Sequence, residues 1–134
     1  MTHPQYTLVA KRAKHRCEYC HAPEIIFNLA FEVDHIVPLS KKGDDKPENL
    51  ALSCRICNLH KLARIEGIDP VTEKVFRLFN PRIDKWEEHF LVDNKTFEIA
   101  GKTPIGRVTV EVLSINSTLQ ISARKIWYIL GVFP

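Results

Sequence analysis

The first half of the chain alternates between apolar and polar positions in two places. The segment LAFEVDHIVPL, residues 29–39, alternates as a half-buried β-strand does and is bounded by Pro38. A polar stretch rich in turn residues, SKKGDDKPEN, separates it from a second short strand, LALSC. Apolar residues then recur at helical spacing in RICNLHKLARI, and Gly67 and Pro70 predict the end of that helix. This order predicts a strand–loop–strand–helix unit.

The flanking segments predict further elements. A helix is expected from about Tyr6 to Arg16, and a later hairpin is expected where HFLV and FEIA flank the turn DNK. Thr103 and Pro104 predict the start of one helix, and a last helix is expected from Ser117 to about Leu130. We therefore expect an α+β fold: a core over residues 1–66 with an N-terminal helix, and a C-terminal hairpin with helices over residues 67–134, packed on it as one domain.

Length and composition suit one compact core. The chain has 134 residues and is 45% hydrophobic, which predicts burial of roughly 65 to 70% of the extended surface. No N-terminal apolar run has the length of a signal peptide, and no stretch approaches the roughly 18 apolar residues of a membrane span. We expect a soluble, cytoplasmic protein with no membrane partner. The oligomeric state does not follow from the sequence.

The net charge of +3 lies entirely in the first half of the chain. Residues 1–64 contain ten Lys and Arg against seven Asp and Glu, whereas residues 65–134 contain nine of each kind. Four of the cations lie in KRAKHR, residues 11–16. Such a patch suits a polyanionic partner, although a solvated helix face is the simpler interpretation of this run taken alone.

The four cysteines form two Cys-x-x-Cys pairs, Cys17 with Cys20 and Cys54 with Cys57. Two such pairs can supply four thiolates to a tetrahedral Zn²⁺, whereas cytosolic thiols stay reduced. Two disulfides, which would require export, and four free core thiols are the alternatives. We favour zinc, which would fasten the N-terminal helix to the helix that begins near Cys54. Four thiolates leave no open coordination position, so we expect a structural role.

Between the cysteine pairs, Asp34 and His35 are followed by Asn49 and Asn58. This spacing, together with the segments DHIVPLS, PENL and CRICN, resembles the HNH (ββα-metal) endonuclease family over residues 17–61. The resemblance implies a ββα-metal core in residues 1–66 and metal-dependent hydrolysis of DNA phosphodiester bonds. The segments LFNPRIDKWEEHF and TPIGRVTV resemble the C-terminal half of small bacterial HNH-signature proteins.

The chemistry of hydrolysis assigns a task to each residue type. His35 is the candidate general base because an imidazole ordinarily titrates near neutrality. Asp34 and Asn58 offer oxygen ligands to a hard catalytic ion, for which we expect Mg²⁺ or Mn²⁺. Neighbouring side chains of a strand point to opposite faces, so the strand must bend or end near His35. In the family, Asn49 would hold the loop that aims His35, and an Asn in a simple turn is compatible with that role.

The third residue of the motif that gives the family its name is a histidine, and this chain has Asn58 in its place. The HNH domains of CRISPR effector nucleases share this replacement, and the loss of an imidazole ligand favours Mg²⁺ or Mn²⁺ over softer ions. His60 follows Asn58 by two residues, so we expect it to face elsewhere as a surface histidine. Lys61 shares the helix face of Asn58 and is predicted to contact phosphate.

Contacts to DNA are predicted for basic residues of the first half, namely Lys11, Arg12, Lys14, Arg16, Lys41, Lys42 and Lys61. A second set in the other half is either a stacking surface or, for its tryptophan, part of the core: Arg77, Arg82, Lys85, Trp86 and His89. The alternative function is a zinc-stapled nucleic-acid-binding module without catalysis. RNA stays open as a partner, and the preferred site, the number of strands cut and the biological role do not follow from the sequence.

Overall fold

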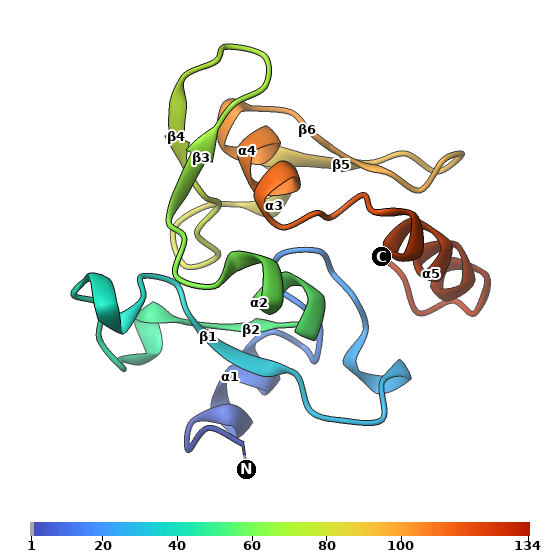
Figure 1. The fold of residues 1–134 in the computed structure, drawn as a ribbon. Helices are drawn as coiled ribbons and strands as arrows, with labels where there is room; N and C mark the ends of the chain where they lie inside the picture. The colour runs from blue at the N-terminus through green and yellow to red at the C-terminus, as the bar shows by residue number, and fades with distance from the viewer. Residues whose placement is uncertain (1) are drawn as a thin grey trace.

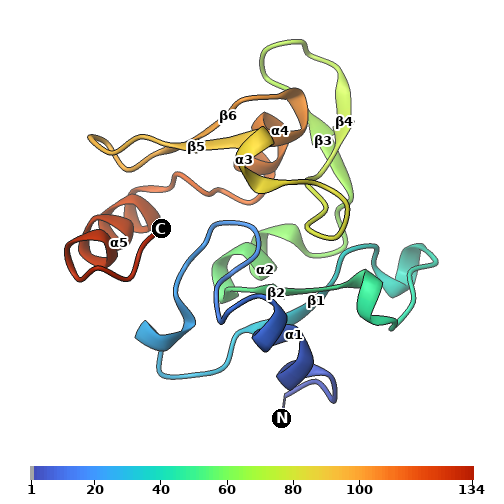
Figure 2. The same ribbon diagram turned by 180° about the vertical axis from the view of Figure 1, so that it is seen from behind.

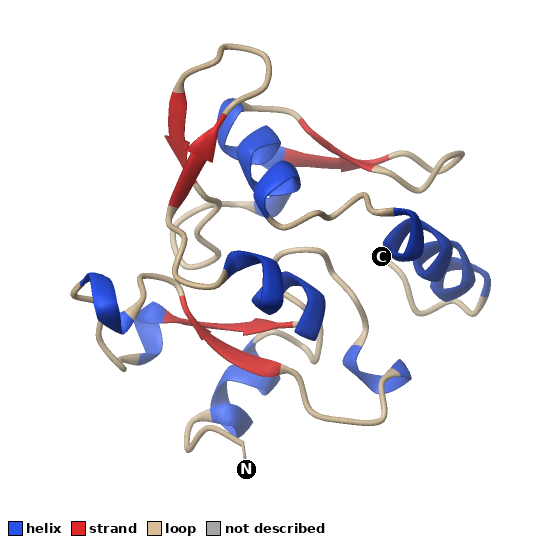
Figure 3. Cartoon of the chain, viewed as in Figure 1, coloured by secondary structure: helices blue, strands red, loops and turns tan. Residues whose placement is uncertain are grey.

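The computed structural model describes residues 2–134, which form short helices and three two-stranded antiparallel sheets (Figures 1 and 3). The α+β class expected from the sequence is confirmed. The helices and strands are, in chain order, α1 (Tyr6–Arg12), β1 (Glu32–His35), β2 (Leu50–Ser53), α2 (Arg55–Lys61), β3 (Glu66–Ile68), β4 (Val75–Arg77), α3 (Trp86–His89), β5 (Phe90–Val92), β6 (Ile99–Gly101), α4 (Pro104–Val112) and α5 (Thr118–Ile129). Short 3-10 helices cover Glu24–Ile26, Leu39–Lys41 and Pro47–Asn49.

The hairpin of β1 and β2 is the centre of the first half. The strands are antiparallel, and His35 at the end of β1 lies opposite Leu50 at the start of β2. All four residues of β2 are buried. Helix α1 packs against β2 and helix α2 against β1, so the hairpin lies between the two helices in both views (Figures 1 and 2). This is the predicted strand–loop–strand–helix unit.

Two further hairpins and helix α4 form the second half. β3 pairs with β4, β5 pairs with β6, and α4 packs against β3, β4 and β6. Helix α4 begins as predicted, because Thr103 Oγ1 accepts the N–H of Gly106 at 3.0 Å and Pro104 takes the first helical position. Gly101 allows the close approach of β6, since a Cβ there would be 2.3 Å from the backbone nitrogen of Arg107.

Buried hydrophobic side chains of both halves meet in one cluster, which includes Leu52 of β2, Phe90 of β5 and Trp127 of α5. Trp86 joins the halves as well: its indole N–H donates to the Tyr19 carbonyl at 2.9 Å, and its ring stacks on His21 with centroids 4.0 Å apart. These contacts join side chains of the second half to the first half. Within residues 2–134, no helix combines the length and the apolar character that crossing a membrane would take.

The first helix is shorter than predicted. It ends at Arg12 rather than near Arg16. Lys14 and His15 both adopt left-handed backbone conformations, each with a φ of 56°. Such a pair cannot continue a right-handed helix. The turn brings Cys17 to the cysteine cluster, which explains why a run of good helix formers stops here.

The second helix also ends early, and the segment after it differs from the prediction. α2 ends at Lys61, where Leu62 turns the chain with a φ of 49°. Gly67 does not end the helix but lies in β3, where a Cβ would be 2.7 Å from Val112 Cγ2. Packing of β3 against α4 therefore accounts for this glycine. The β3–β4 hairpin and α3 occupy a region for which no strand or helix was predicted from the sequence.

Candidate active site and metal centre

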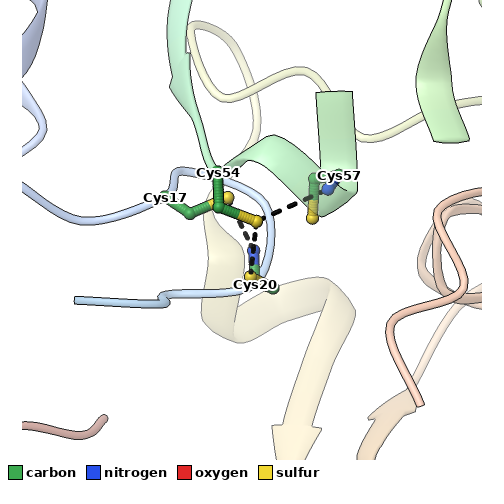
Figure 4. A group of neighbouring side chains, drawn as sticks. All are labelled: Cys17, Cys20, Cys54 and Cys57. Atoms are coloured by element: carbon green, nitrogen blue, oxygen red, sulfur yellow. Dashed lines mark hydrogen bonds between the residues drawn. The ribbon is translucent and has the colours of Figure 1, made fainter. Parts of the chain in front are cut away.

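Four cysteine side chains meet where the loop after α1 passes the start of α2 (Figure 4). All four are buried, and their Sγ atoms lie within 4.8 Å of one another. The Sγ atoms of Cys20 and Cys54 are 3.7 Å apart, which is too far for a disulfide bond, and the four thiols are free. The disulfide alternative is therefore wrong. Four converging buried thiols fit the tetrahedral donor set of a structural Zn²⁺.

Local backbone geometry prepares these thiols for a metal. The N–H of Cys20 lies 3.5 Å from Cys17 Sγ, and the N–H of Cys57 lies 3.4 Å from Cys54 Sγ at the N-terminus of α2. Burial raises the pKa of the Cys17 thiol, but hydrogen bonds from the other three thiols outweigh it and hold that pKa well below its usual value. The cluster is thus able to release a first proton, as metal binding requires.

Asp34 lies on the buried side of β1. Its Oδ2 accepts a hydrogen bond from the Tyr19 hydroxyl at 2.7 Å, and the Lys61 ammonium lies 3.1 Å from Oδ2 and 3.3 Å from Oδ1. Burial raises the pKa of Asp34, while the positive charge of Lys61 and the Tyr19 hydroxyl act against that rise. Among the described residues, Oδ1 has this one long hydrogen bond, so it keeps capacity for a further ligand.

The position of Lys61 corrects one prediction. Its side chain is 2% exposed, and its ammonium donates to the carbonyl oxygens of His35 at 3.0 Å and Ile36 at 3.1 Å. A side chain held inside by these oxygens and by Asp34 is not available to phosphate, so the predicted phosphate contact is wrong. Lys61 instead ties α2 to the end of β1, beside the two candidate catalytic residues.

Asn49 closes the loop between β1 and β2. Its Oδ1 accepts the N–H of Val37 at 2.9 Å, and its Nδ2 donates to the carbonyls of Val37 at 2.9 Å and Asp44 at 2.7 Å. Gly43 lies inside this loop, where a Cβ would be 1.8 Å from the Val37 carbonyl oxygen, so the closed loop requires glycine. This is the geometry expected of a residue that holds the loop.

His35 is the last residue of β1, as the need for the strand to bend or end predicted. Its ring faces the loop that Asn49 holds, with Nε2 2.8 Å from Asp45 Oδ1. The side chain is 22% exposed and can therefore be reached from solvent. The His35 carbonyl is held by Lys61, so both the backbone and the ring of this residue have fixed partners.

A cavity of about 320 Å³ brings the candidate residues together. Asp34, His35 and Asn58 all line it, as do apolar residues that include Leu39. His60 is not among its lining residues: it is exposed, and its Nδ1 lies 2.9 Å from the Ile56 carbonyl oxygen one turn earlier. The expectation that His60 faces elsewhere is confirmed. One space thus contains a carboxylate, an imidazole and an amide.

The predicted basic residues fall into an exposed group and an internally bonded group. Lys41 and Lys42 are exposed, directly after Ser40, which lines the cavity. Lys11 in α1 and Lys14 just after it are exposed, and α1 lies on the opposite side of the hairpin from α2 (Figures 1 and 2). These four lysines are available to a polyanion.

The arginines of the same run hold the fold together. Arg12 donates to the Leu50 carbonyl at 2.6 Å, which ties α1 to the start of β2. Arg16 donates to the Val132 carbonyl at 2.7 Å, which ties the C-terminal segment to the first half. Their guanidinium groups are occupied by these contacts, so their predicted role in DNA binding gains no support from the geometry.

In the second basic set, Arg77 and Lys85 are exposed, whereas Arg82, Trp86 and His89 are partly buried. Arg77 donates to both carboxylate oxygens of Asp84, at 2.7 and 2.8 Å. Arg82 pairs with Glu18. Trp86 is partly buried against His21, as the core interpretation of this tryptophan expected. A stacking surface at these residues is not supported.

The cysteine cluster and the cavity residues lie in one segment that matches a known family. Residues 17–64 match the family model described as HNH endonuclease. This segment is therefore similar to an HNH domain, and it includes a four-cysteine cluster that could hold a metal ion. Neither the curated proteins nor the solved structures include a significant match to the chain.

Three residues around the site carried no signal in the sequence. Tyr19 lies between the first two cysteines, Asp45 lies in a polar loop, and His3 lies near the N-terminus. Each contacts Asp34 or His35 directly or through one residue. The course of the loop, which Asn49 closes, places Asp45 beside His35, and alternation along a strand does not report such a contact.

Proposed function

We propose that this protein is a metal-dependent endonuclease that hydrolyses phosphodiester bonds of DNA. The observation that carries the proposal is the cavity shared by Asp34, His35 and Asn58. It surrounds one space with an imidazole, a carboxylate and an amide oxygen, inside a segment similar to an HNH domain. Hydrolysis of a phosphodiester requires a base for water and positive charge near the phosphate, and these side chains supply the base and the metal ligands.

His35 accepts the proton of the attacking water. A histidine suits this task because imidazole exchanges protons near neutral pH. The Lys61 ammonium holds the His35 carbonyl, and the loop closed by Asn49 lies against the ring. The base is thus held from two sides, which reduces the reorganisation needed when substrate binds.

Asp34 Oδ1 and the side-chain oxygen of Asn58 would hold one Mg²⁺ or Mn²⁺, because hard divalent ions prefer oxygen ligands. When bound, the ion offsets the negative charge that develops on the phosphate and the leaving 3′ oxygen. Asn58 is uncharged, and Asp34 already shares its charge with Lys61. We therefore expect weak metal affinity in the free protein and stronger affinity when substrate phosphate adds its oxygens.

The proposed zinc cluster is linked to this site because its cysteines lie next to site residues in the chain. Asn58 directly follows Cys57 in α2, and Tyr19, which donates to Asp34, lies between Cys17 and Cys20. Zn²⁺ bound by the four thiolates would therefore fix both segments that meet at the cavity. Lys41 and Lys42 beside the cavity would contact the DNA backbone, with Lys11 and Lys14 as contacts for a longer duplex.

A zinc-stapled binding module without catalysis remains the alternative, and one experiment separates the two functions. Purified protein is incubated with supercoiled plasmid in Mg²⁺, in Mn²⁺ and in EDTA, and DNA binding is measured by gel shift in the same buffers. The endonuclease predicts nicked or linear plasmid with either metal and none with EDTA. A gel shift without cleavage in every buffer would favour the binding module. Parallel reactions with RNA decide between the two nucleic acids.

A further inference from the structure

One carboxylate oxygen of Asp45 lies within hydrogen-bond distance of two histidine rings. The Nε2 atoms of His35 and His3 lie 2.8 Å and 2.9 Å from Asp45 Oδ1. The two imidazole rings meet edge to face, with centroids 5.9 Å apart. The proposed function assigns no task to Asp45 or His3, although both are linked to the candidate general base.

A backbone hydrogen bond sets the tautomer of His3. The N–H of Gln5 donates to His3 Nδ1 at 3.0 Å, so Nδ1 is unprotonated and the neutral ring carries its proton on Nε2. That proton points at Asp45 Oδ1. An ionised carboxylate only accepts hydrogen bonds, so His35 Nε2, which lies equally close, must also carry a proton.

For His35 this arrangement leaves Nδ1 as the nitrogen with a free lone pair. The general base of the proposed reaction needs such a lone pair, and a neutral imidazole without a fixed partner is free to adopt either tautomer. A hydrogen bond to one ring nitrogen decides which nitrogen is the base and in which direction it points. Asp45 makes that hydrogen bond here.

The backbone around Asp45 is held in place from two directions. Asn49 Nδ2 donates to the Asp44 carbonyl at 2.7 Å, and Gln5 Nε2 donates to the Asp45 carbonyl at 2.7 Å. The loop-holding role of Asn49 thereby acquires a defined path to the base. Asn49 fixes the loop, the loop carries Asp45, and Asp45 holds the ring of His35.

We propose that Asp45 is a positioning residue that keeps His35 in the tautomer protonated at Nε2, with Nδ1 free to take a proton from water, and that His3 steadies Asp45. This rests on the proposed function, in which His35 is the general base. The Asp45 side chain is 59% exposed, and hydrogen-bonded ion pairs at such positions add little to stability. The contact therefore acts on the orientation of His35 and not on folding.

The same three side chains have the ligand types of a transition-metal site, and their ligand atoms lie within 4.8 Å of one another. The Gln5 hydrogen bond speaks against that use. A metal-binding histidine leaves the nitrogen that faces the metal unprotonated and donates from the other one. His3 does the reverse, because its Nδ1 accepts from the Gln5 N–H.

The first test measures the tautomer and does not depend on activity. Long-range ¹H–¹⁵N correlation spectra of the zinc-loaded protein at about pH 8.5, where ordinary imidazoles are neutral, show which nitrogen of each histidine carries the proton. Spectra of His3→Ala and His35→Ala assign the two rings. We expect both rings protonated at Nε2 in the parent, and His35 as a mixture of tautomers in Asp45→Ala. A parent His35 protonated at Nδ1 overturns the proposal, whether or not the protein cleaves DNA.

The second test measures single-turnover cleavage, DNA affinity and melting temperature of Asp45→Ala. The matched control is Asp44→Ala, the same change one residue earlier in a side chain that bonds the Lys46 N–H and neither histidine. Asp45→Ala should cleave at least about 10-fold more slowly, since loss of the partner that orients a metal-binding histidine already costs about 10- to 100-fold, with Kd and Tm near those of the parent. Asp45→Glu should recover part of the rate.

Two outcomes of the second test count against the proposal. Equal losses in Asp44→Ala and Asp45→Ala would show that loop charge, and not orientation of His35, sets the rate. Cleavage by Asp45→Ala at the parent's rate would show that His35 needs no partner. A parent that does not cleave refutes the proposed function instead, and the tautomer spectra still decide the role of Asp45.

Discussion

The ammonium of Lys61 and the carboxylate of Asp34 form a buried ion pair, with Nζ 3.1 Å from Oδ2 and both side chains almost wholly removed from solvent. The pair joins α2 to β1, and the same ammonium donates to the carbonyls of His35 and Ile36 at the end of that strand. Removal of one partner of a buried pair leaves an uncompensated charge, which is strongly destabilising. Loss of either partner alone should therefore destabilise the protein and disturb the cavity that Asp34 lines.

Replacement of Lys61 should expose this dependence. Lys61→Met should lower the free energy of unfolding by about 3 to 5 kcal/mol, since Asp34 stays buried without its cation. Equilibrium unfolding in urea measures the change. The double variant Lys61→Met/Asp34→Asn should recover part of the loss, because no unpaired charge remains. If Lys61→Met is as stable as the parent, the pair is not a structural link.

If the four-cysteine cluster binds zinc as proposed, the protein should contain one zinc ion per chain, and its folding should depend on that ion. Cys54→Ser should unfold the first half and not merely slow cleavage, because a structural zinc site supplies much of the folding free energy of a small domain. Elemental analysis and circular dichroism, with and without a strong chelator, measure both properties. Folded parent protein without zinc would contradict this assignment.

The hairpin–helix core and the start of α4 were predictable from the sequence because their signals are local. Alternation marked β1, and Thr103 with Pro104 marked the start of α4. The burial of Lys61 was not predictable, since its helix face was foreseen but its contact with Asp34 spans 27 positions of the chain. β3 and β4 are three residues long, too short to show a period, and Gly67 reports packing on α4 and not a helix end.

In the candidate site, too, the residues with local sequence signals were predicted and the long-range contacts were not. His35, Asp34 and Asn58 were found from their types and spacing, and the cavity brings them together. Asp45 was missed because its contact with His35 depends on the course of a loop, which Asn49 closes through hydrogen bonds to backbone atoms. Side-chain patterns along the chain report faces of helices and strands, whereas contacts across an irregular loop depend on its three-dimensional course.

Asn58 is expected to select the metal ion. Asn58→Ala should lose most cleavage and keep DNA binding, which depends mainly on phosphate contacts. Asn58→His should move activity toward Ni²⁺, Co²⁺ or Zn²⁺, because nitrogen ligands follow the transition-metal affinity order. Cleavage rates of the parent and both variants across Mg²⁺, Mn²⁺, Ni²⁺ and Zn²⁺ test this. Cleavage by Asn58→Ala at the parent's rate in Mg²⁺ would remove Asn58 from the site.

The contact between Asp69 and Arg107 in the second half should make stability sensitive to acid. The buried Asp69 carboxylate accepts from Arg107 Nε at 2.8 Å and from a terminal guanidinium nitrogen at 2.9 Å, and these bonds hold the pKa of Asp69 well below its usual value. A lowered folded-state pKa gives stability that is present above about pH 4 and lost as the pH falls further. Asp69→Asn should be less stable at neutral pH and lose less on acidification.

Melting temperatures between about pH 7 and pH 2 test this dependence. Glu111→Gln is a suitable control, because Glu111 is an exposed acid of α4, the helix that also carries Arg107. If the melting temperatures of Asp69→Asn and of the control fall with pH as the parent's does, the Asp69–Arg107 contact does not determine the loss of stability in acid.

If His35 takes the proton from water, single-turnover cleavage of plasmid DNA in Mg²⁺ should depend on it, and His35→Ala measures that dependence. His60→Ala is the matched control, since His60 is exposed and does not line the cavity. His35→Ala should lose ~10² to 10⁴-fold in rate, with zinc content, Tm and DNA affinity near the parent's, while His60→Ala should cleave normally. Cleavage by folded His35→Ala at the parent's rate would contradict it.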